Sequence, residues 1–300
     1  MTERITSASN PRVKRLTALG RKAKLRREER VFIIEGERLY TDTPRKYLKE
    51  IYMTEEFLSQ KHGGSEPDNC TIVTPEIMRK ISDTDTPQGV LCVAKMPSYT
   101  RKDLLGSADG RTPLLLLLEN IQDPGNLGTM MRTAEAAGVT GVMMSRDTVD
   151  LFNPKTVRAT MSAIFRMPFL YTDDLVGEIG RLRKEGIAVY AAHLRASRPY
   201  DEADCRKPCA FLIGNEGNGL SEEAANAASG RVHIPMQGSI ESLNAAMAAG
   251  ILFLKPQGRE ERADMAVCFA HRLSEAPHES DLKVCFSMLY CNCSAQGKKC

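Results

Sequence analysis

Five consecutive leucines, Leu114 to Leu118, constrain the fold of this chain more than any other segment. An unbroken apolar run of this length is typical of a strand that is covered on both faces, as in a parallel sheet with helices on either side. The next segment predicts a helix from about Leu127 to Ala137, closed by Gly138, and then a strand at Val142 to Met144. We therefore expect an α/β domain whose ligand site lies beyond the carboxyl ends of its strands.

Further apolar runs and helical stretches continue this alternation to about residue 257. Together with the first two strands they give about five or six parallel strands. The expected helices are Pro154 to Ala163, Leu175 to Lys184 and Leu243 to Leu254, and the expected strands are Ile187 to Ala191, Ala210 to Ile213 and Val232 to Ile234. Lys255-Pro256-Gln257-Gly258 is a stop signal, so this domain should span residues 114–257.

Residues 1–97 predict a separate, smaller α/β domain, because short strands and helices alternate there as well. The expected strands are Val31 to Ile34, Ile51 to Met53, Thr71 to Val73 and Val90 to Val93, and the expected helices are Arg12 to about Glu29, Glu35 to about Lys49, Glu55 to Gln60 and Pro75 to Ile81. Residues 98–113 are polar and interrupted by glycine and proline, which indicates an interdomain linker.

Charge is distributed unevenly along the chain. The formal net charge is only +3, but residues 1–30 hold ten lysines and arginines against three glutamates. This asymmetry suggests a polyanionic partner for the first domain, and the alternative is an ordinary solvated helix face. No stretch is apolar enough to cross a membrane and the first residues do not have the order of a secretory signal, so we expect a cytoplasmic protein.

The nine cysteines do not form a recognisable metal motif. Cys70, Cys92, Cys205 and Cys209 are scattered and are expected to be reduced thiols, while the other five lie in the last 33 residues. Cys291-Asn292-Cys293 has the wrong spacing for a zinc knuckle, so no metal is expected. Residues 258–300 have little periodicity and predict a disordered tail, possibly translated from a shifted reading frame, that catalysis does not need.

Glycines and small polar residues follow two of the predicted strands. Gly214 to Leu220 follows the strand that ends at Ile213, and it holds one acid, Glu216. Glycines at the exit of a buried strand allow backbone amides to approach a ligand closely. Ser239, Ser242 and Asn244 follow the next strand, at the start of a helix, where free backbone N–H groups collect. Two such exits suggest one shared pocket.

Three segments resemble the SpoU/TrmH family of S-adenosylmethionine-dependent RNA 2′-O-ribose methyltransferases, a branch of the SPOUT class. They are Asn126-Leu127-Gly128 with Arg132, Ile213 to Leu220, and Ile234-Pro235-Met236 followed by Ser242-Leu243-Asn244. The similarity covers about residues 114–254. The first domain also resembles the substrate-binding domain of many of these enzymes. The resemblance implies a C-terminal trefoil knot, a homodimer formed through the knotted domain, and RNA as the partner, with ribosomal RNA favoured over transfer RNA.

The resemblance also implies roles for individual residues. S-adenosyl-L-methionine would be bound by Leu212, Gly214, Asn215, Gly219, Ile234, Met236, Ser242 and Leu243, largely through backbone groups. The ribose would be surrounded by Asn126, Arg132, Glu216, Ser242 and Asn244. A guanidinium stays protonated in proteins, so Arg132 is expected to anchor phosphate and stabilise a developing alkoxide. Glu216 is expected either to orient Arg132 or to accept the proton.

Each residue also has a structural explanation. Asn126 can cap a helix that begins at Leu127, Ser242 and Asn244 can cap the next one, and Glu216 can bind backbone amides. Arg132 can be a surface charge. The glycines of residues 214–219 alone do not make a dinucleotide fingerprint, which disfavours an oxidoreductase. The alternative functions are a non-catalytic RNA-binding or ribosome-assembly factor of the same fold, and a transfer RNA 2′-O-methyltransferase.

Overall fold

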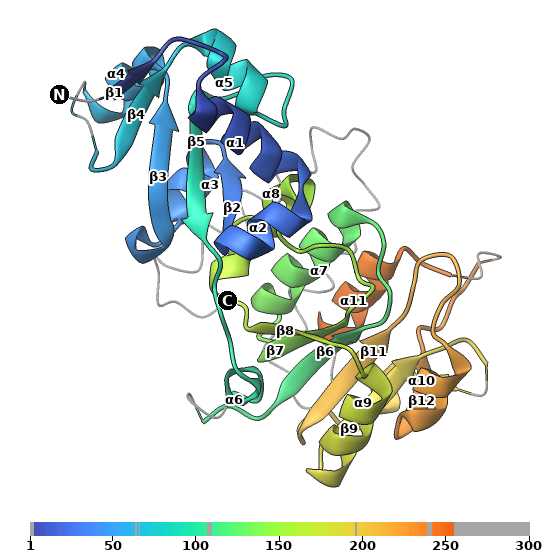
Figure 1. The fold of residues 1–300 in the computed structure, drawn as a ribbon. Coiled ribbons are helices and arrows are strands. Elements are labelled where there is room, and N and C mark those ends of the chain that lie inside the picture. The colour runs from blue at the N-terminus through green and yellow to red at the C-terminus, as the bar shows by residue number, and fades with distance from the viewer. Residues whose placement is uncertain are drawn as a thin grey trace, which may run out of the picture.

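The computed structural model describes residues 3–254, apart from residues 64, 66, 107–109, 196 and 239–241, and its strands form two sheets (Figure 1). The first sheet has the order β1-β4-β3-β5-β2 and mixes parallel and antiparallel pairs. The elements of this part are β1 Glu3–Ile5, α1 Pro11–Arg21, α2 Ala23–Glu29, β2 Val31–Glu35, α3 Glu37–Asp42, a 3₁₀ turn at Arg45–Tyr47, β3 Leu48–Met53, α4 Glu55–His62, β4 Cys70–Val73, α5 Pro75–Ile81, β5 Val90–Lys95 and α6 Arg101–Leu104.

The second sheet has seven strands in the order β10-β12-β9-β11-β6-β7-β8, and every adjacent pair is parallel. Its elements are β6 Leu114–Leu118, α7 Pro124–Ala136, β7 Gly141–Ser145, α8 Pro154–Thr160, a 3₁₀ turn at Ala163–Phe165, β8 Phe169–Thr172, α9 Leu175–Lys184, β9 Ala188–Ala192, β10 Arg198–Pro199, β11 Cys209–Ile213, α10 Glu222–Ala227, β12 Gly230–His233 and α11 Ala245–Leu254. The predicted α/β fold with a parallel sheet is therefore confirmed.

The five leucines of β6 are all buried, as the sequence predicts. Leu115 and Leu117 belong to a core that includes α9 and α10, whereas Leu114, Leu116 and Leu118 belong to a core that includes α7 and α11. Figure 1 shows these helix pairs on opposite faces of the sheet. Successive side chains of a strand point to opposite faces, so a strand between two helix layers needs an apolar residue at every position.

Several predicted boundaries are wrong. The helix expected from Arg12 to Glu29 is broken at Lys22, whose φ of −110° and ψ of 103° are extended. The break allows the Arg26 guanidinium to bond the carbonyl oxygens of Leu19 and Gly20, at 2.7 and 3.2 Å, and so satisfy the end of α1. The helix expected to reach Lys49 ends at Asp42. Strands β8 and β10 were not expected at all.

About half of the basic side chains of the first helices form ion pairs within the protein. Arg12 pairs with Glu3, Arg15 with Glu29 and Glu50, and Arg26 with Asp150. The exposed cations of this region that have no ion pair within the described residues are Lys14, Arg21, Lys22, Arg27 and Arg30. The polyanion surface that the charge pattern suggests is therefore smaller than the sequence indicates.

The two sheets share one apolar core. Phe32 on β2 lies with its ring centroid 4.9 Å from that of Phe152 and 5.7 Å from that of Phe165, both of which follow β7 in the chain. The expected linker is also packed, because Leu104 of α6 is 1% exposed and Arg101 pairs with Glu178 and Glu185 on and after α9. The polar composition of residues 98–113 did not indicate this packing.

None of the helices in the described part of the chain has both the length and the apolar character that a bilayer crossing needs. Cys92, Cys205 and Cys209 are buried and Cys70 is half-buried, and burial raises the pKa of the Cys92 thiol. The tail 258–300, with its five cysteines, lies outside the described residues, as does Ser239.

Candidate functional site

The turn after β11 is held in one conformation by its own residues. Asn215 and Gly219 exchange two backbone hydrogen bonds of 3.0 and 2.9 Å, and the Asn215 Oδ1 atom accepts from the amides of Gly217 and Asn218. A Cβ atom at Gly214 would lie 2.3 Å from the Gly219 carbonyl carbon, so this position requires glycine. The Asn215 Nδ2 group donates to the carbonyl of Asn120 and so ties the ends of β11 and β6 together.

Glu216 lies at the centre of the contacts between this turn and the segment after β6. Its Oε2 atom accepts from the Gln122 amide at 3.1 Å, and its Oε1 atom accepts from the Asp123 amide at 3.2 Å and from the Asn126 Nδ2 group at 3.0 Å. Glu216 therefore satisfies backbone amides, as the structural explanation proposed, and at the same time orients the Asn126 side chain.

Asn126 does not cap the helix that follows it. Helix α7 begins at Pro124, and its cap is Asp123, whose Oδ1 atom accepts from the Asn126 amide at 2.7 Å. The capping explanation for Asn126 is therefore wrong. The Asn126 side chain points instead into the hydrogen-bonded network, because its Oδ1 atom accepts from the Asn244 Nδ2 group at 2.9 Å.

Asn244 serves two purposes. Its Oδ1 atom accepts from the amides of Ala246 and Met247 in the first turn of α11, at 3.0 and 3.3 Å, so it caps that helix. Its Nδ2 group donates to Asn126. The carboxylate at one end and the backbone donors at the other fix the direction of every hydrogen bond in the chain Glu216–Asn126–Asn244, since each amide has one donor and one acceptor group.

The Glu216 carboxylate is stabilised in its charged form. Burial tends to raise its pKa, but the hydrogen bonds from Asn126, Gln122, Asp123 and its own backbone together hold the pKa below the usual value. A carboxylate with a lowered pKa is a weak general base at neutral pH. The geometry therefore favours an orienting role for Glu216 over proton acceptance.

Arg132 is not placed beside Asn126 on the helix. It is half-buried in α7, six residues after Asn126. Six positions turn the side chain by about 240°, so the two side chains leave the helix in different directions. Glu216 accepts a side-chain hydrogen bond from Asn126 at 3.0 Å.

The residues predicted to bind a cofactor differ in their exposure. The side chain of Leu212 is fully buried in the sheet, so only its backbone is available to a ligand. Ile234, Met236 and Leu243 are half-buried, and Ser242 is exposed. A Cβ atom at Gly219 would meet no atom within 4 Å, so the backbone of this turn is open on that side. An open backbone edge at the same end of the sheet as half-buried apolar side chains fits a ligand with an apolar heterocycle and a few polar groups.

Three residues of this network were not identified from the sequence. Asn120 has a φ of 54° and accepts from Asn215, and Gln122 donates through Nε2 to the carbonyl of Asp147 at 2.9 Å. Glu119 accepts from the amide and hydroxyl of Ser221 at 2.8 and 2.6 Å. The polar run directly after Leu118 is the signal that could have identified them, because it must lie at the carboxyl edge of the sheet.

Comparisons with known proteins identify the family of this chain. The sequence pattern described as the SpoU rRNA Methylase family matches residues 113–254, and that of the MRM3-like substrate binding domain matches residues 10–92. The chain is 34% identical over 260 residues to the 23S rRNA (guanosine(2553)-2′-O)-methyltransferase RlmP of Bacillus subtilis, which covers 85% of this chain and 100% of that protein. It is 33% identical over 178 residues to the 23S rRNA (guanosine-2′-O-)-methyltransferase RlmB of Ralstonia nicotianae, covering 59% of this chain and 71% of that protein.

A solved structure is similar over nearly the same range. The AdoMet-bound rRNA methyltransferase from Sinorhizobium meliloti superposes with a TM-score of 0.71 at 31% identity and covers 85% of this chain and 97% of that chain. The similarity in sequence spans both sheets, and the similarity in structure does so as well. The chain therefore belongs to the SpoU rRNA methylase family of RNA 2′-O-ribose methyltransferases.

Proposed function

We propose that this protein transfers the methyl group of S-adenosyl-L-methionine to the 2′-hydroxyl of a ribose in ribosomal RNA. The observation that carries the proposal is the hydrogen-bonded chain Glu216–Asn126–Asn244, which fixes polar side chains from three distant segments at the carboxyl edge of a parallel sheet. Membership of the SpoU rRNA methylase family supports the reaction and the methyl donor. The names of two relatives support guanosine as the modified nucleoside.

The residues of the site divide into two groups. Bound S-adenosyl-L-methionine supplies a methyl group already activated on a sulfonium, and its binding site consists of Leu212, Gly214, Asn215, Gly219, Ile234, Met236, Ser242 and Leu243. The ribose is surrounded by Asn126, Arg132, Glu216, Ser242 and Asn244. Arg132 anchors a phosphate and stabilises the negative charge that develops on the ribose oxygen. Glu216 holds Asn126 in place, since its charged form is already stabilised by four hydrogen bonds.

The other parts of the chain have supporting roles in this proposal. Residues 1–97 bind the RNA, which the match to a substrate-binding domain over residues 10–92 supports. Residues 98–113 connect them to the methyltransferase domain, 114–257, and the tail 258–300 is not required. The expected location is the cytoplasm.

We infer a trefoil knot and a homodimer from the resemblance to the family. Helix α11 returns from the β12 side of the sheet to pack against α7 and β11, as a threaded C-terminal segment must. Met247 on this helix is 45% exposed, although it is a large apolar residue. Burial of such a residue in a subunit interface would stabilise a dimer.

Met247→Lys should therefore convert the dimer to a monomer in light scattering, because it places a charge in the proposed interface. Leu194→Lys, at another exposed apolar residue, should leave the mass unchanged. A monomeric wild-type protein, or a Met247→Lys variant that stays dimeric, would count against this interface.

Incubation with labelled S-adenosyl-L-methionine and ribosomal RNA tests the activity. The label should appear on a ribose oxygen, and Arg132→Ala should lower the rate by roughly 100-fold or more because a charge at the developing alkoxide is lost. Arg206→Ala, which removes an exposed arginine paired with Asp204, is the control. Label on a base, or equal rates for Arg132→Ala and wild type, would refute the assignment. Tight RNA binding without donor binding would indicate the non-catalytic alternative.

A further inference from the structure

A cavity of about 480 Å³ opens on the first sheet, between α3, the start of β3 and α4. Its volume lies within the usual range of small-ligand sites. It is distinct from the Glu216 site, because none of the residues of that site lines it. The lining residues that matter here are three rings and three cations: Tyr40, Phe57, His62, Arg45, Lys49 and Lys61. We call it the Tyr40 cavity.

The three rings form a cluster in one wall of the Tyr40 cavity. The centroid of the Tyr40 ring lies 5.8 Å from that of His62 and 6.4 Å from that of Phe57, and both pairs meet edge to face. The Tyr40 hydroxyl and the His62 Nε2 atom are 3.3 Å apart, within hydrogen-bond distance. Phe57 is buried beneath them at 5% exposure, whereas Tyr40 and His62 are half-buried. Part of the Tyr40 and His62 rings is therefore available to a planar ligand.

Two of the three cations beside these rings are not neutralised within the described residues. Arg45 and Lys49 are exposed, and neither has an ion pair within the described residues. Lys46 lies between them in the chain, with its Nζ atom 5.0 Å from the centroid of the Tyr47 ring. Two acidic residues line the cavity. Glu37 is paired with Lys61 at 2.6 Å, so only Asp68 remains among the lining acids to offset the charges of Arg45 and Lys49. The cavity therefore has an excess of positive charge that suits a phosphate group.

We propose that the Tyr40 cavity binds one unpaired nucleotide of the RNA substrate, with the base against Tyr40 and His62 and its phosphate at Arg45 and Lys49. This inference rests on RNA being the partner, as proposed above. Aromatic side chains next to cations are the usual means by which proteins hold unstacked bases, and a base-paired nucleotide cannot present its face in this way.

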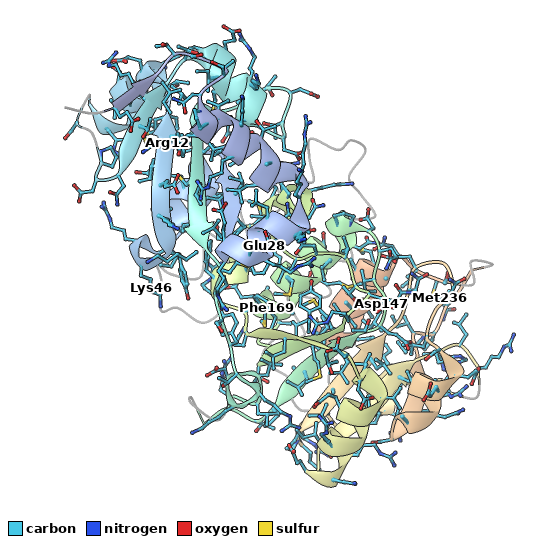
Figure 2. All side chains as sticks on the ribbon, viewed as in Figure 1. Arg12, Glu28, Lys46, Asp147, Phe169 and Met236 are labelled. Atoms are coloured by element: carbon cyan, nitrogen blue, oxygen red, sulfur yellow. The ribbon has the colours of Figure 1, made fainter. Side chains whose placement is uncertain are left out.

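The location of the cavity determines what this contact does. Figure 2 shows Lys46, next to Arg45 in the chain, on the opposite flank of the molecule from Asp147 and Met236. Asp147 accepts from Gln122 at the Glu216 site, and Met236 follows β12. The bound nucleotide is therefore remote from the ribose that is methylated. It anchors a large folded RNA and takes no part in the chemical step.

Binding of ribosomal RNA to Arg45→Ala/Lys49→Ala and to Tyr40→Leu tests the proposal. Each variant should bind roughly tenfold more weakly, and the double variant should lower the salt dependence of binding by about two units of slope, one for each phosphate contact. The methylation rate at saturating RNA should not change. Lys102→Ala/Lys184→Ala, which removes the same charge from exposed positions on α6 and α9, should keep wild-type affinity.

Ultraviolet cross-linking followed by peptide mass spectrometry identifies the contact directly, and the expected result is a nucleotide attached to Tyr40 or His62. Unchanged affinity of Arg45→Ala/Lys49→Ala relative to the Lys102→Ala/Lys184→Ala control overturns the inference. Because these positions are exposed, this comparison remains valid even if Tyr40→Leu fails to fold. If adenosine or guanosine monophosphate abolishes the cross-link at concentrations that leave RNA binding intact, the inference is also overturned, in favour of a small-metabolite site. A cross-link at Tyr40 in a protein that does not methylate RNA would support the cavity and refute the proposed reaction.

Discussion

Asp150→Ala should destabilise the protein by about 3–5 kcal/mol, because it leaves a buried guanidinium without its counter-charge. Arg26 is 3% exposed, and its Nη2 and Nε groups donate to Asp150 Oδ2 at 2.5 and 3.2 Å. The carbonyl groups of Leu19 and Gly20 would remain as acceptors, but they carry no full charge. Chemical denaturation measures the loss of unfolding free energy.

Asp173→Ala is the matched control for this prediction. Asp173 pairs with Arg146, but the two side chains are 77% and 64% exposed, so solvent screens their pairing and its loss should change the stability far less than the loss of Asp150 does. The double variant Arg26→Met/Asp150→Leu should recover most of the loss, because it removes the buried charge together with its partner. Equal losses of unfolding free energy in Asp150→Ala and Asp173→Ala would show that the buried pair contributes no more to stability than the exposed pair.

Glu216→Gln should lower the methylation rate by roughly 100-fold, even though the two side chains have nearly the same shape. Both carboxylate oxygens of Glu216 accept hydrogen bonds, one from Gln122 and the other from Asp123 and Asn126. A glutamine must place its NH₂ group against one of these donors, so Asn126 or the turn before α7 has to move. Glu223→Gln, on the exposed face of α10, should leave the rate unchanged.

The pH dependence of the wild-type rate separates the two roles considered for Glu216. Since hydrogen bonds lower the pKa of its carboxyl group despite burial, Glu216 is charged at every pH above the usual carboxyl range. The hydrogen bonds with which the charged carboxylate orders the site are fully present above that pH range, and they are lost as the pH falls through the lowered pKa. Measured between about pH 6 and 9, the rate should show no inflection from Glu216. An inflection in this range that disappears in Glu216→Gln would identify it as the proton acceptor.

The sequence was most informative where a residue pattern has one structural meaning. The leucine run allowed only a strand covered on both faces, and the glycines after Ile213 predicted a tight turn that Gly214 indeed requires. Glu216 and Asn244 were grouped because they follow two strands whose exits suggested a shared pocket, whereas Asn126 was added to them by the resemblance. Their hydrogen bonds join residues 90 and 118 positions apart, and no local pattern specifies contacts at such separations.

Other errors arose from a start signal that was overlooked, from a distant contact, and from a helix too short to show a pattern. Pro124 at the first position of α7, after Asp123, is the same start signal that Asn10-Pro11 gives for α1, yet Asn126 was considered as the cap. The break at Lys22 depends on Arg26, whose contact with Asp150 lies 124 residues away. Helix α6 has four residues, too few to show a periodic apolar face, so its buried Leu104 appeared to belong to a linker.

The contact of Phe32 with Phe152 and Phe165 has a consequence for substrate selection. Since the two sheets are joined through an apolar core, the separation between the Tyr40 cavity and the Glu216 site is set by the protein and not by the RNA. An RNA whose unpaired nucleotide and target ribose lie at a different separation would have to deform, and the free energy of deformation would weaken its binding. Selection among similar loops would then depend on their three-dimensional span, in addition to any contact with the modified base.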